Sequence, residues 1–258
     1  MFLDMDDCLI IKQALFDEAQ GKFFAYVSHF GFSTEEVSRK FDAVDTEMFR
    51  THGFLSRRLV NSFEAVLKHF IPDANPEEMG IVRGFADEVF NSTVQLKPGV
   101  KEAVGFLAER FPVYIVTQGD ESVQKRFLSQ LPFRNKLSGE FVIKKDEEAY
   151  SRIVRLLELK PSEVVMIGDS VNSDIIPSVK AGLHAIWVPG HCSPLHDKAG
   201  TSLPEGVFQF KSLLEAAYFV VSRELPVVAS NDGGKSAKQS APPVPEGNIC
   251  PQLGCVIN

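Results

Sequence analysis

Acidic residues crowd the start of the chain, where three carboxylates lie within four positions. The sequence begins Met1-Phe2-Leu3, continues with Asp4, Asp6 and Asp7, and becomes apolar again at Leu9. Residues two apart on an extended backbone share a face, so Asp4 and Asp6 point the same way. Two carboxylates about 4 Å apart repel by roughly 4 kcal/mol at an effective dielectric constant near 20. The pair therefore calls for a cation or a proton, although a surface acidic turn would use the same residue types.

Polar residues also follow three later apolar segments. Each of these segments ends in groups suited to binding an anion or a metal ion. They are Thr117-Gln118-Gly119-Asp120, the pair Lys144-Lys145, and Gly168-Asp169-Ser170, with Asp174 five residues beyond Asp169. Any one of these segments is weak evidence for a functional site, because polar residues follow most buried strands. All of them in this order, on one sheet, would form a specific constellation.

The elements that would position these groups alternate between short strands and helices. Strands are predicted at 113–116, 140–143, 164–167, 184–188 and 208–210, and helices at 100–110, 121–131, 147–159, 175–181 and 213–223. Short, wholly apolar strands alternating with helices predict an α/β fold, a Rossmann-like parallel sheet with helices on both faces. Right-handed crossovers place all the strand ends at one edge, where such sheets bind ligands.

The segment between the first strand and this alternating region has a different pattern of apolar residues. Residues 12–95 show helical spacing of apolar residues, many of them phenylalanine, and no convincing strand. We therefore predict a catalytic core from 1–11 and 96–225, an all-helical cap at 12–95, and a disordered tail at 226–258 that is rich in Ser, Gly, Pro and Lys. The first strand has only three residues before Asp4, so it is either unusually short or cut by the start of the sequence.

This arrangement resembles the haloacid dehalogenase-like superfamily over nearly the whole length to about residue 222. Asp4-Met5-Asp6-Asp7-Cys8-Leu9 resembles the first family motif, Thr117 the second, Lys145 the third, and Gly168-Asp169-Ser170-Val171-Asn172-Ser173-Asp174 the fourth. Residues 12–95 fall where this family inserts its cap. Asp7 stands where many members have glycine, and Cys8 stands where threonine is usual.

The resemblance and the chemistry of the residues assign the same roles. Asp4 would be the nucleophile and Asp6 the general acid and base. Asp4, Asp169 and the backbone carbonyl of Asp6 would hold Mg²⁺, with Asp174 a further ligand or an orienting group. The transferred phosphoryl oxygens would be bound by Thr117, by the amides from Gln118 onward, and by a lysine.

Two alternatives about this site stay open. Lys145 fits the spacing in the apparently nearest relatives, whereas Lys144 fits a commoner family form, and adjacent residues on a strand end cannot both point inward. The second acid, Asp6, favours phosphate-ester hydrolysis, because the superfamily's dehalogenases lack that acid and need no metal. The predicted activity is therefore a Mg²⁺-dependent phosphatase for a small phosphate monoester.

Other functions compete with this prediction. The chain could be a nucleotidase or sugar-phosphatase specialist, or a catalytically silent member that uses the fold for binding, although retention of the motif residues argues against silence. Arg57 and Arg58 could bind an anionic group at one end of a substrate. Arginines on the exposed surface of a helix are the commoner explanation for such residues. The phenylalanines are expected in the cap core, with one or two lining a substrate pocket.

Composition limits the partners and the compartment. The net charge is −7 with a pI near 5.4, which argues against nucleic acid or an anionic membrane as a main partner. Four cysteines without zinc-like spacing predict reduced thiols in the cytoplasm. The last four residues, Cys255-Val256-Ile257-Asn258, have the form of a prenylation signal, but Asn is not a preferred final residue. A small phosphorylated metabolite is the expected partner.

Overall fold

The computed structural model describes residues 1–190 and 202–222, so the predicted tail at 226–258, with Cys255, lies outside the described residues. A six-stranded parallel sheet forms the centre, in the order β3-β2-β1-β4-β5-β6. The predicted parallel sheet is confirmed, and its strands are β1 (Phe2–Leu3), β2 (Tyr114–Thr117), β3 (Gly139–Val142), β4 (Val165–Gly168), β5 (His184–Trp187) and β6 (Phe208–Gln209).

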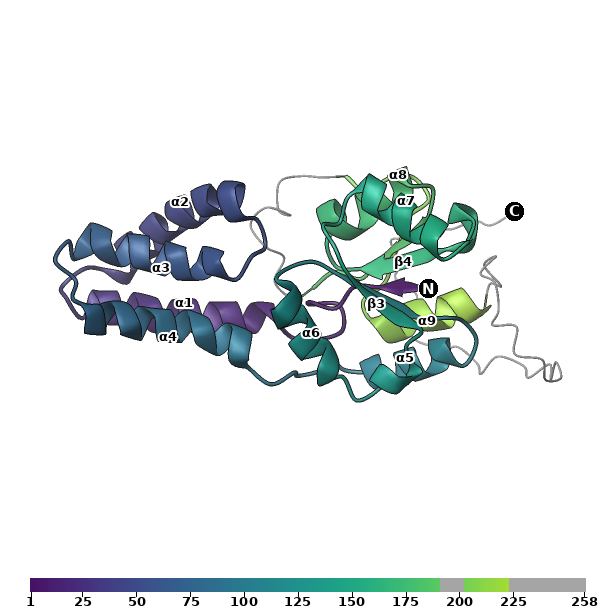
Figure 1. Ribbon diagram of the computed structural model, residues 1–258, viewed down its shortest axis with the longest axis horizontal. Helices are drawn as coiled ribbons and strands as arrows, with labels where there is room; N and C mark the ends of the chain where they lie inside the picture. The colour runs from purple at the N-terminus through teal and green to yellow at the C-terminus, as the bar shows by residue number, and fades with distance from the viewer. Residues whose placement is uncertain (191–201, 223–258) are drawn as a thin grey trace.

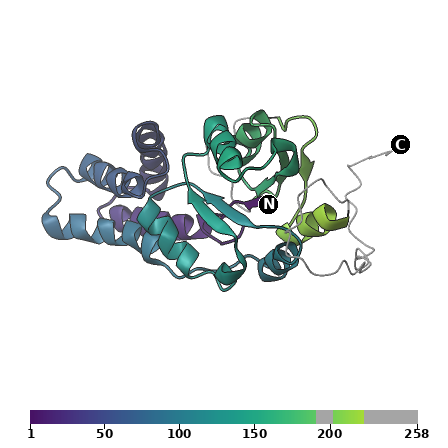
Figure 2. The same cartoon turned by 45° about the vertical axis from the view of Figure 1, so that its right-hand side comes forward.

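Helices cover both faces of the sheet (Figures 1 and 2). One face carries α5 (Val100–Ala108), α6 (Glu121–Ser129) and α9 (Leu213–Ser222), and the other carries α7 (Glu147–Leu156) and α8 (Ile176–Lys180). Alternate residues of a strand face opposite ways. Accordingly Leu3 is buried with the first group of helices, and its neighbour Phe2 is buried with α7. Short 3-10 helices at Arg134–Lys136 and Pro161–Glu163 lead into β3 and β4.

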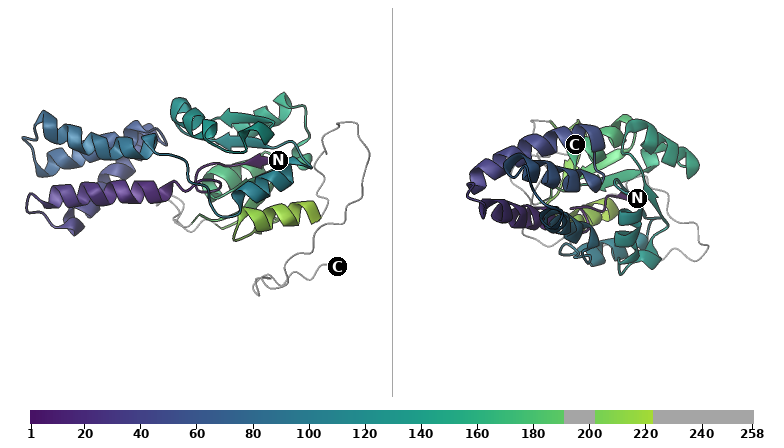
Figure 3. Two further views of the ribbon diagram at one scale, coloured as in Figure 1. Left: turned by 90° about the horizontal axis from the view of Figure 1, so that it is seen from below. Right: turned by 60° about the vertical axis from the view of Figure 1, so that its left-hand side comes forward.

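Of the five helices between β1 and β2 in the sequence, the first four pack together beside the sheet (Figures 1 and 3). They are α1 (Gln13–Ser28), α2 (Thr34–His52), α3 (Arg57–Phe70) and α4 (Pro76–Asn91), and we call them the helical insertion. They bury an apolar cluster of their own, in which the Phe23 and Phe63 rings stack with centroids 4.3 Å apart. The predicted run of helices is confirmed, while its status as a separate domain at 12–95 stays a prediction.

Local capping explains where two of these helices begin. The Ser33 hydroxyl accepts from the Glu36 backbone N–H, and the Glu36 carboxylate accepts from the Ser33 N–H. Asn75 and Glu78 form the same reciprocal pair, with Pro76 in the first helical position. Such pairs satisfy backbone donors that the first turn of a helix leaves free.

The predicted helix at Ile175–Ala181 begins earlier and is not uniform. A π-helical turn covers Val171–Ile175 and passes directly into α8. The wider turn is formed by the Ile175 N–H, which donates to the Ser170 carbonyl five residues earlier at 3.2 Å. The Asp174 carboxylate accepts from the Ser170 N–H in the same turn. In the described residues, no helix has the length and apolar character that a bilayer-spanning segment needs.

Candidate active site

The first predicted acid lies at the carboxyl edge of the sheet. The Asp4 N–H donates to the carbonyl of Ile167 in β4 at 2.9 Å, which continues the pairing of β1 beyond its last residue. The side chains of Asp4, Asp169 and Asp174 are buried, and each offers one carboxylate oxygen within 4.8 Å of the other two. Asp4, from the start of the chain, therefore meets two carboxylates from the segment that follows β4.

Lys145 places its ammonium group among these carboxylates. Its Nζ lies 2.6 Å from Asp174 Oδ1 and also forms an ion pair with Asp4. The Lys145 backbone N–H donates to the side-chain carbonyl of Gln118 at 2.7 Å, which fixes the end of the strand. The side chain of Lys144, in contrast, is 83% exposed. Of the two lysines that the sequence left open, Lys145 lies with the acids.

The charges in this group perturb one another. The pKa of Asp4 is raised to about 7, chiefly by burial. The charge of Lys145 acts to lower this pKa, and the charges of Asp174 and Asp6 act to raise it. Burial and the charge of Asp4 raise the pKa of Asp169 well above its ordinary value. Burial alone would lower the pKa of Lys145, but Asp174 and Asp4 raise it. One ammonium thus faces three carboxylates, and the excess of buried oxygen ligands fits a hard divalent cation.

The turn after β4 is shaped to hold two of the acids. A Cβ atom on Gly168 would lie 2.4 Å from the Asp174 carboxylate carbon, so this position has no room for a side chain. The Ser170 N–H donates to Asp174 Oδ2 at 3.0 Å. The Trp187 indole N–H donates to the Asp169 carbonyl at 2.6 Å, which ties the turn to β5.

Asp7 joins the sheet to the helical insertion and lies near the group of three carboxylates. Its φ is +55°, a conformation that glycine adopts freely and aspartate tolerates better than most residues. Its carboxylate accepts from the backbone N–H groups of Lys12 at 3.0 Å and Gln13 at 2.9 Å. Lys97 Nζ donates to the Asp7 carbonyl at 2.6 Å. Asp7 therefore fixes the chain where α1 begins.

Asp6 lies apart from the group of three carboxylates. Its Oδ2 lies 2.7 Å from Lys12 Nζ and accepts from the Gln124 side-chain amide at 2.9 Å. Its Oδ1 is a buried oxygen without a hydrogen-bond partner in the described structure. This placement agrees with a metal contact through the Asp6 carbonyl alone, and it leaves one carboxylate oxygen of Asp6 for a different task.

Gln124 connects the predicted residues of two strand ends. Its side chain is buried, and Nε2 lies 2.8 Å from Thr117 Oγ1, 2.7 Å from the Gln118 carbonyl and 2.9 Å from Asp6 Oδ2. The Thr117 hydroxyl oxygen accepts a hydrogen bond from Gln124. The hydroxyl hydrogen of Thr117 is therefore available to donate to a group bound at the carboxyl edge of the sheet. Thr117 is also buried.

Sequence reasoning missed Lys12 and Gln124. Gln124 did carry a signal, since it shares one helix face with the buried Phe127 and Leu128, where a polar side chain needs a partner. Lys12 carried none, because a lysine before a helix is usually solvated. Here it is only 8% exposed, its Nζ lies 3.4 Å from Gln124 Oε1, and it is 5.0 Å from the centroid of the Phe127 ring.

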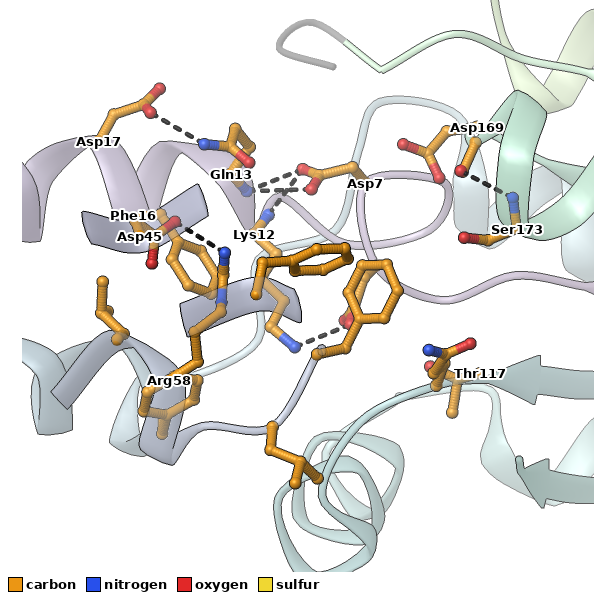
Figure 4. A pocket seen from close by; sticks show the side chains of 18 of the residues that line it. Asp7, Lys12, Gln13, Phe16, Asp17, Asp45, Arg58, Thr117, Asp169 and Ser173 are labelled. Atoms are coloured by element: carbon orange, nitrogen blue, oxygen red, sulfur yellow. Dashed lines mark hydrogen bonds and ion pairs between the residues drawn. The ribbon is translucent and has the colours of Figure 1, made fainter. Parts of the chain in front are cut away.

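A cavity of about 670 Å³ extends from the strand ends into the helical insertion (Figure 4). Its strand-end half contains all of the predicted site residues named above. Its insertion half is lined by α1, α2, α3 and the end of α4, and it includes Arg58. The favoured explanation of Arg58 as a surface residue is wrong: its side chain is 18% exposed and pairs with Asp45 at 2.7 Å. Arg57 is exposed.

The insertion also contacts the core directly beside this cavity. The Ser56 backbone N–H donates to the Asp120 carboxylate at 2.6 Å, which links the loop before α3 to the segment that follows β2. Both parts of the chain therefore border the cavity.

Comparison with known proteins agrees with this geometry. The sequence profile of the haloacid dehalogenase-like hydrolases matches residues 1–182. The chain belongs to the haloacid dehalogenase-like hydrolase family. No curated protein sequence matches it.

Solved structures show the same fold at low sequence identity. A haloacid dehalogenase-like family hydrolase from Xanthomonas campestris superposes with a TM-score of 0.73 at 20% identity, covering 86% of this chain and 89% of that chain. A HAD phosphatase from Thermococcus onnurineus gives 0.54 at 17% identity, covering 85% and 96%. A 2-haloacid dehalogenase from Pseudomonas syringae pv. Tomato DC3000 gives 0.54 at 16% identity, covering 86% and 97%. The fold is thus shared by phosphatases and dehalogenases, and only this chain's own residues can decide between the two reactions.

Proposed function

We propose that this hydrolase is a Mg²⁺-dependent phosphatase that cleaves a small phosphate monoester through an aspartyl-phosphate on Asp4. The observation that carries the proposal is the second acid, Asp6, held by Lys12 and Gln124 beside the buried acidic group. A halide leaves without a proton, whereas an alkoxide needs one. An acid placed for proton transfer therefore favours ester hydrolysis.

Asp4, Asp169 and the carbonyl of Asp6 are the groups that would hold Mg²⁺, and Asp174 supports them while holding Lys145. When bound, the ion would neutralise charge on the transferred phosphoryl group and on the carboxylates around it. The donor set fits this ion because it consists of buried oxygen atoms in excess of the available ammonium groups.

In the first step the Asp4 carboxylate attacks phosphorus and the bond to the leaving oxygen breaks. Asp6 gives its proton to that oxygen, so that a neutral alcohol leaves. Lys145 and the Thr117 hydroxyl stabilise the equatorial oxygens of the transferred group. In the second step Asp6 takes a proton from water, which attacks the aspartyl-phosphate and releases inorganic phosphate.

The helical insertion supplies the other wall of the site and would act as the cap. The hydrogen bond from the Ser56 N–H to Asp120 is the contact we expect to break and re-form as substrate enters. Closure would exclude water, which protects the acyl phosphate until Asp6 activates one molecule.

The decisive experiment measures phosphate release from a panel of phosphate monoesters with Mg²⁺ and with a chelator, alongside Asp4→Asn. We expect turnover with Mg²⁺, loss of turnover with the chelator, and no measurable turnover by Asp4→Asn. A parallel assay measures halide release from 2-chloropropionate. Full turnover by Asp4→Asn, or halide release in chelator without phosphate release, would contradict the proposal.

A further inference from the structure

The insertion half of the cavity differs in chemistry from the strand-end half. Five phenylalanines from four segments line it: Phe16, Phe41, Phe49, Phe54 and Phe90. The rings of Phe49 and Phe54 meet edge to face with centroids 5.0 Å apart. An apolar group bound there would remove water from its own surface and from the phenylalanine rings, which favours binding. The far wall is therefore suited to an apolar or aromatic group.

The charge on this wall is already balanced or negative. Among the described residues that line the insertion half, Arg58 is the only cation. Its Nη1 lies 2.7 Å from Asp45 Oδ2, and its guanidinium lies 5.5 Å from the centroid of the Phe49 ring. Ser62 donates to the other oxygen of Asp45 at 2.8 Å, which holds that carboxylate in place. A second anion on a substrate would have to displace Asp45 from Arg58.

Two further carboxylates strengthen this bias. Asp17 and Asp42 both line the insertion half. Asp17 accepts from the Gln13 side-chain amide at 3.0 Å, a neutral donor that does not cancel its charge. With Asp45 they make three carboxylates against one guanidinium, so an anionic group there would be repelled and a cationic group attracted.

We propose that the insertion half selects phosphate monoesters whose alcohol carries an apolar or aromatic body and no second anionic group. This inference rests on the proposed phosphatase activity and adds its substrate class. Esters with a distal carboxylate or a second phosphate would be poor substrates. An ammonium group at the same distal place would be accepted.

Two matched sets of substrates test the inference, both assayed with Mg²⁺. The first set is 4-propylphenyl phosphate, tyramine phosphate and the phosphate ester of 3-(4-hydroxyphenyl)propanoate. They share a 4-alkylphenol leaving group and differ only in distal charge. We expect kcat/KM for the neutral and cationic esters to exceed that of the carboxylate by at least tenfold. Equal or better turnover of the carboxylate would overturn the inference.

The second set tests the aromatic wall with two primary alkyl phosphates of similar leaving-group acidity. We expect kcat/KM for 2-phenylethyl phosphate to exceed that for ethyl phosphate by at least tenfold, mainly through KM. Equal values would overturn the inference. Release of phosphate from all of the esters without discrimination, or from none of them while other monoesters of the panel are hydrolysed, would overturn this inference alone. Release from no monoester of either set or of the panel would overturn the proposed phosphatase itself.

Variants connect the discrimination to the named residues. Asp45→Asn frees Arg58 from its counter-ion, so we expect the preference against the distal carboxylate to shrink at least fivefold. Asp42→Asn removes a wall charge at an exposed position and provides a second test if Asp45→Asn does not fold. Asp87→Asn is the matched control, because Asp87 is exposed on α4 and does not line the cavity. Unchanged discrimination in a folded Asp45→Asn variant, or in Asp42→Asn where that one is used, would overturn the assignment.

Discussion

The two halves of the cavity are built on different principles. The strand-end half is polar, and its side chains are held by several partners each, as Asp6 and Lys145 are. The insertion half is a wall of phenylalanine rings with one internal ion pair and exposed acids. Held polar groups suit a fixed reaction, because charge development must meet groups that are already in position. An apolar wall suits substrate choice, because burial is not directional.

This contrast predicts that changes on the strand-end side alter rate, whereas changes on the insertion side alter preference. The predictions below test that division, beginning with the largest expected effect.

Lys145→Met should lower kcat/KM by about 10³-fold or more, since it removes the one ammonium that faces Asp4 and Asp174. Removing one partner from a buried ion pair also costs about 3–5 kcal/mol of stability, so melting should be measured alongside phosphate release. Lys144→Met is the matched control and should change kcat/KM less than twofold, because that side chain is 83% exposed. A reversal of the two effects would refute the placement of the lysines.

Asp4 should make the metal-free protein less stable as the pH rises. Its pKa is about 7 in the folded protein against an ordinary 3.8, so the folded state binds more protons than the unfolded state between these values. The free energy of unfolding of the wild type therefore falls from about pH 4 to about pH 7. Asn carries no proton here, so the stability difference between Asp4→Asn and wild type should grow by about 2–4 kcal/mol over that window. Chemical denaturation in the presence of a chelator measures the free energy of unfolding of both proteins at each pH. A stability difference that does not change with pH would contradict the prediction.

Gln124→Glu should lower kcat about 10- to 100-fold, mostly without changing KM for a substrate that binds through the insertion half. A carboxylate there would repel Asp6, and its oxygens would accept the Thr117 proton that is otherwise free for the phosphoryl group. Gln130→Glu makes the same change just after the end of α6, outside the cavity, and should leave kcat unaltered. Equal effects of the two variants on kcat would show that Gln124 has no special position.

Two glycine substitutions should have opposite signs. Gly168→Ala drives a methyl group into the Asp174 carboxylate at 2.4 Å and should cost about 1–3 kcal/mol. Gly80→Ala on α4 meets nothing within 4 Å and should stabilise the protein by about 0.5–1 kcal/mol. Thermal melting measures both changes. Loss of activity should accompany the first substitution and not the second.

Much of the fold could be predicted from the sequence, because strand and helix periodicities are local properties of the chain. The alternation from residue 96 onward predicted the parallel sheet, and the spacing of apolar residues at 12–95 predicted the run of helices. The π-helical turn at Val171–Ile175 could not be predicted in this way. It is formed by a backbone hydrogen bond from Ile175 to the Ser170 carbonyl five residues earlier, and the spacing of apolar residues does not indicate such a bond.

For the site, the sequence by itself determined which chemical groups stand at the strand ends, because parallel strands joined by helices must bring those ends to one edge. Only the tertiary structure decided that Lys145 rather than Lys144 faces Asp4, across 141 positions of sequence, and that Gln124 reaches Asp6 across 118. It also decided that Arg58 lies in the cavity and is balanced by Asp45. These contacts depend on how distant elements pack against one another, and side-chain direction at a packed interface is set by both partners together.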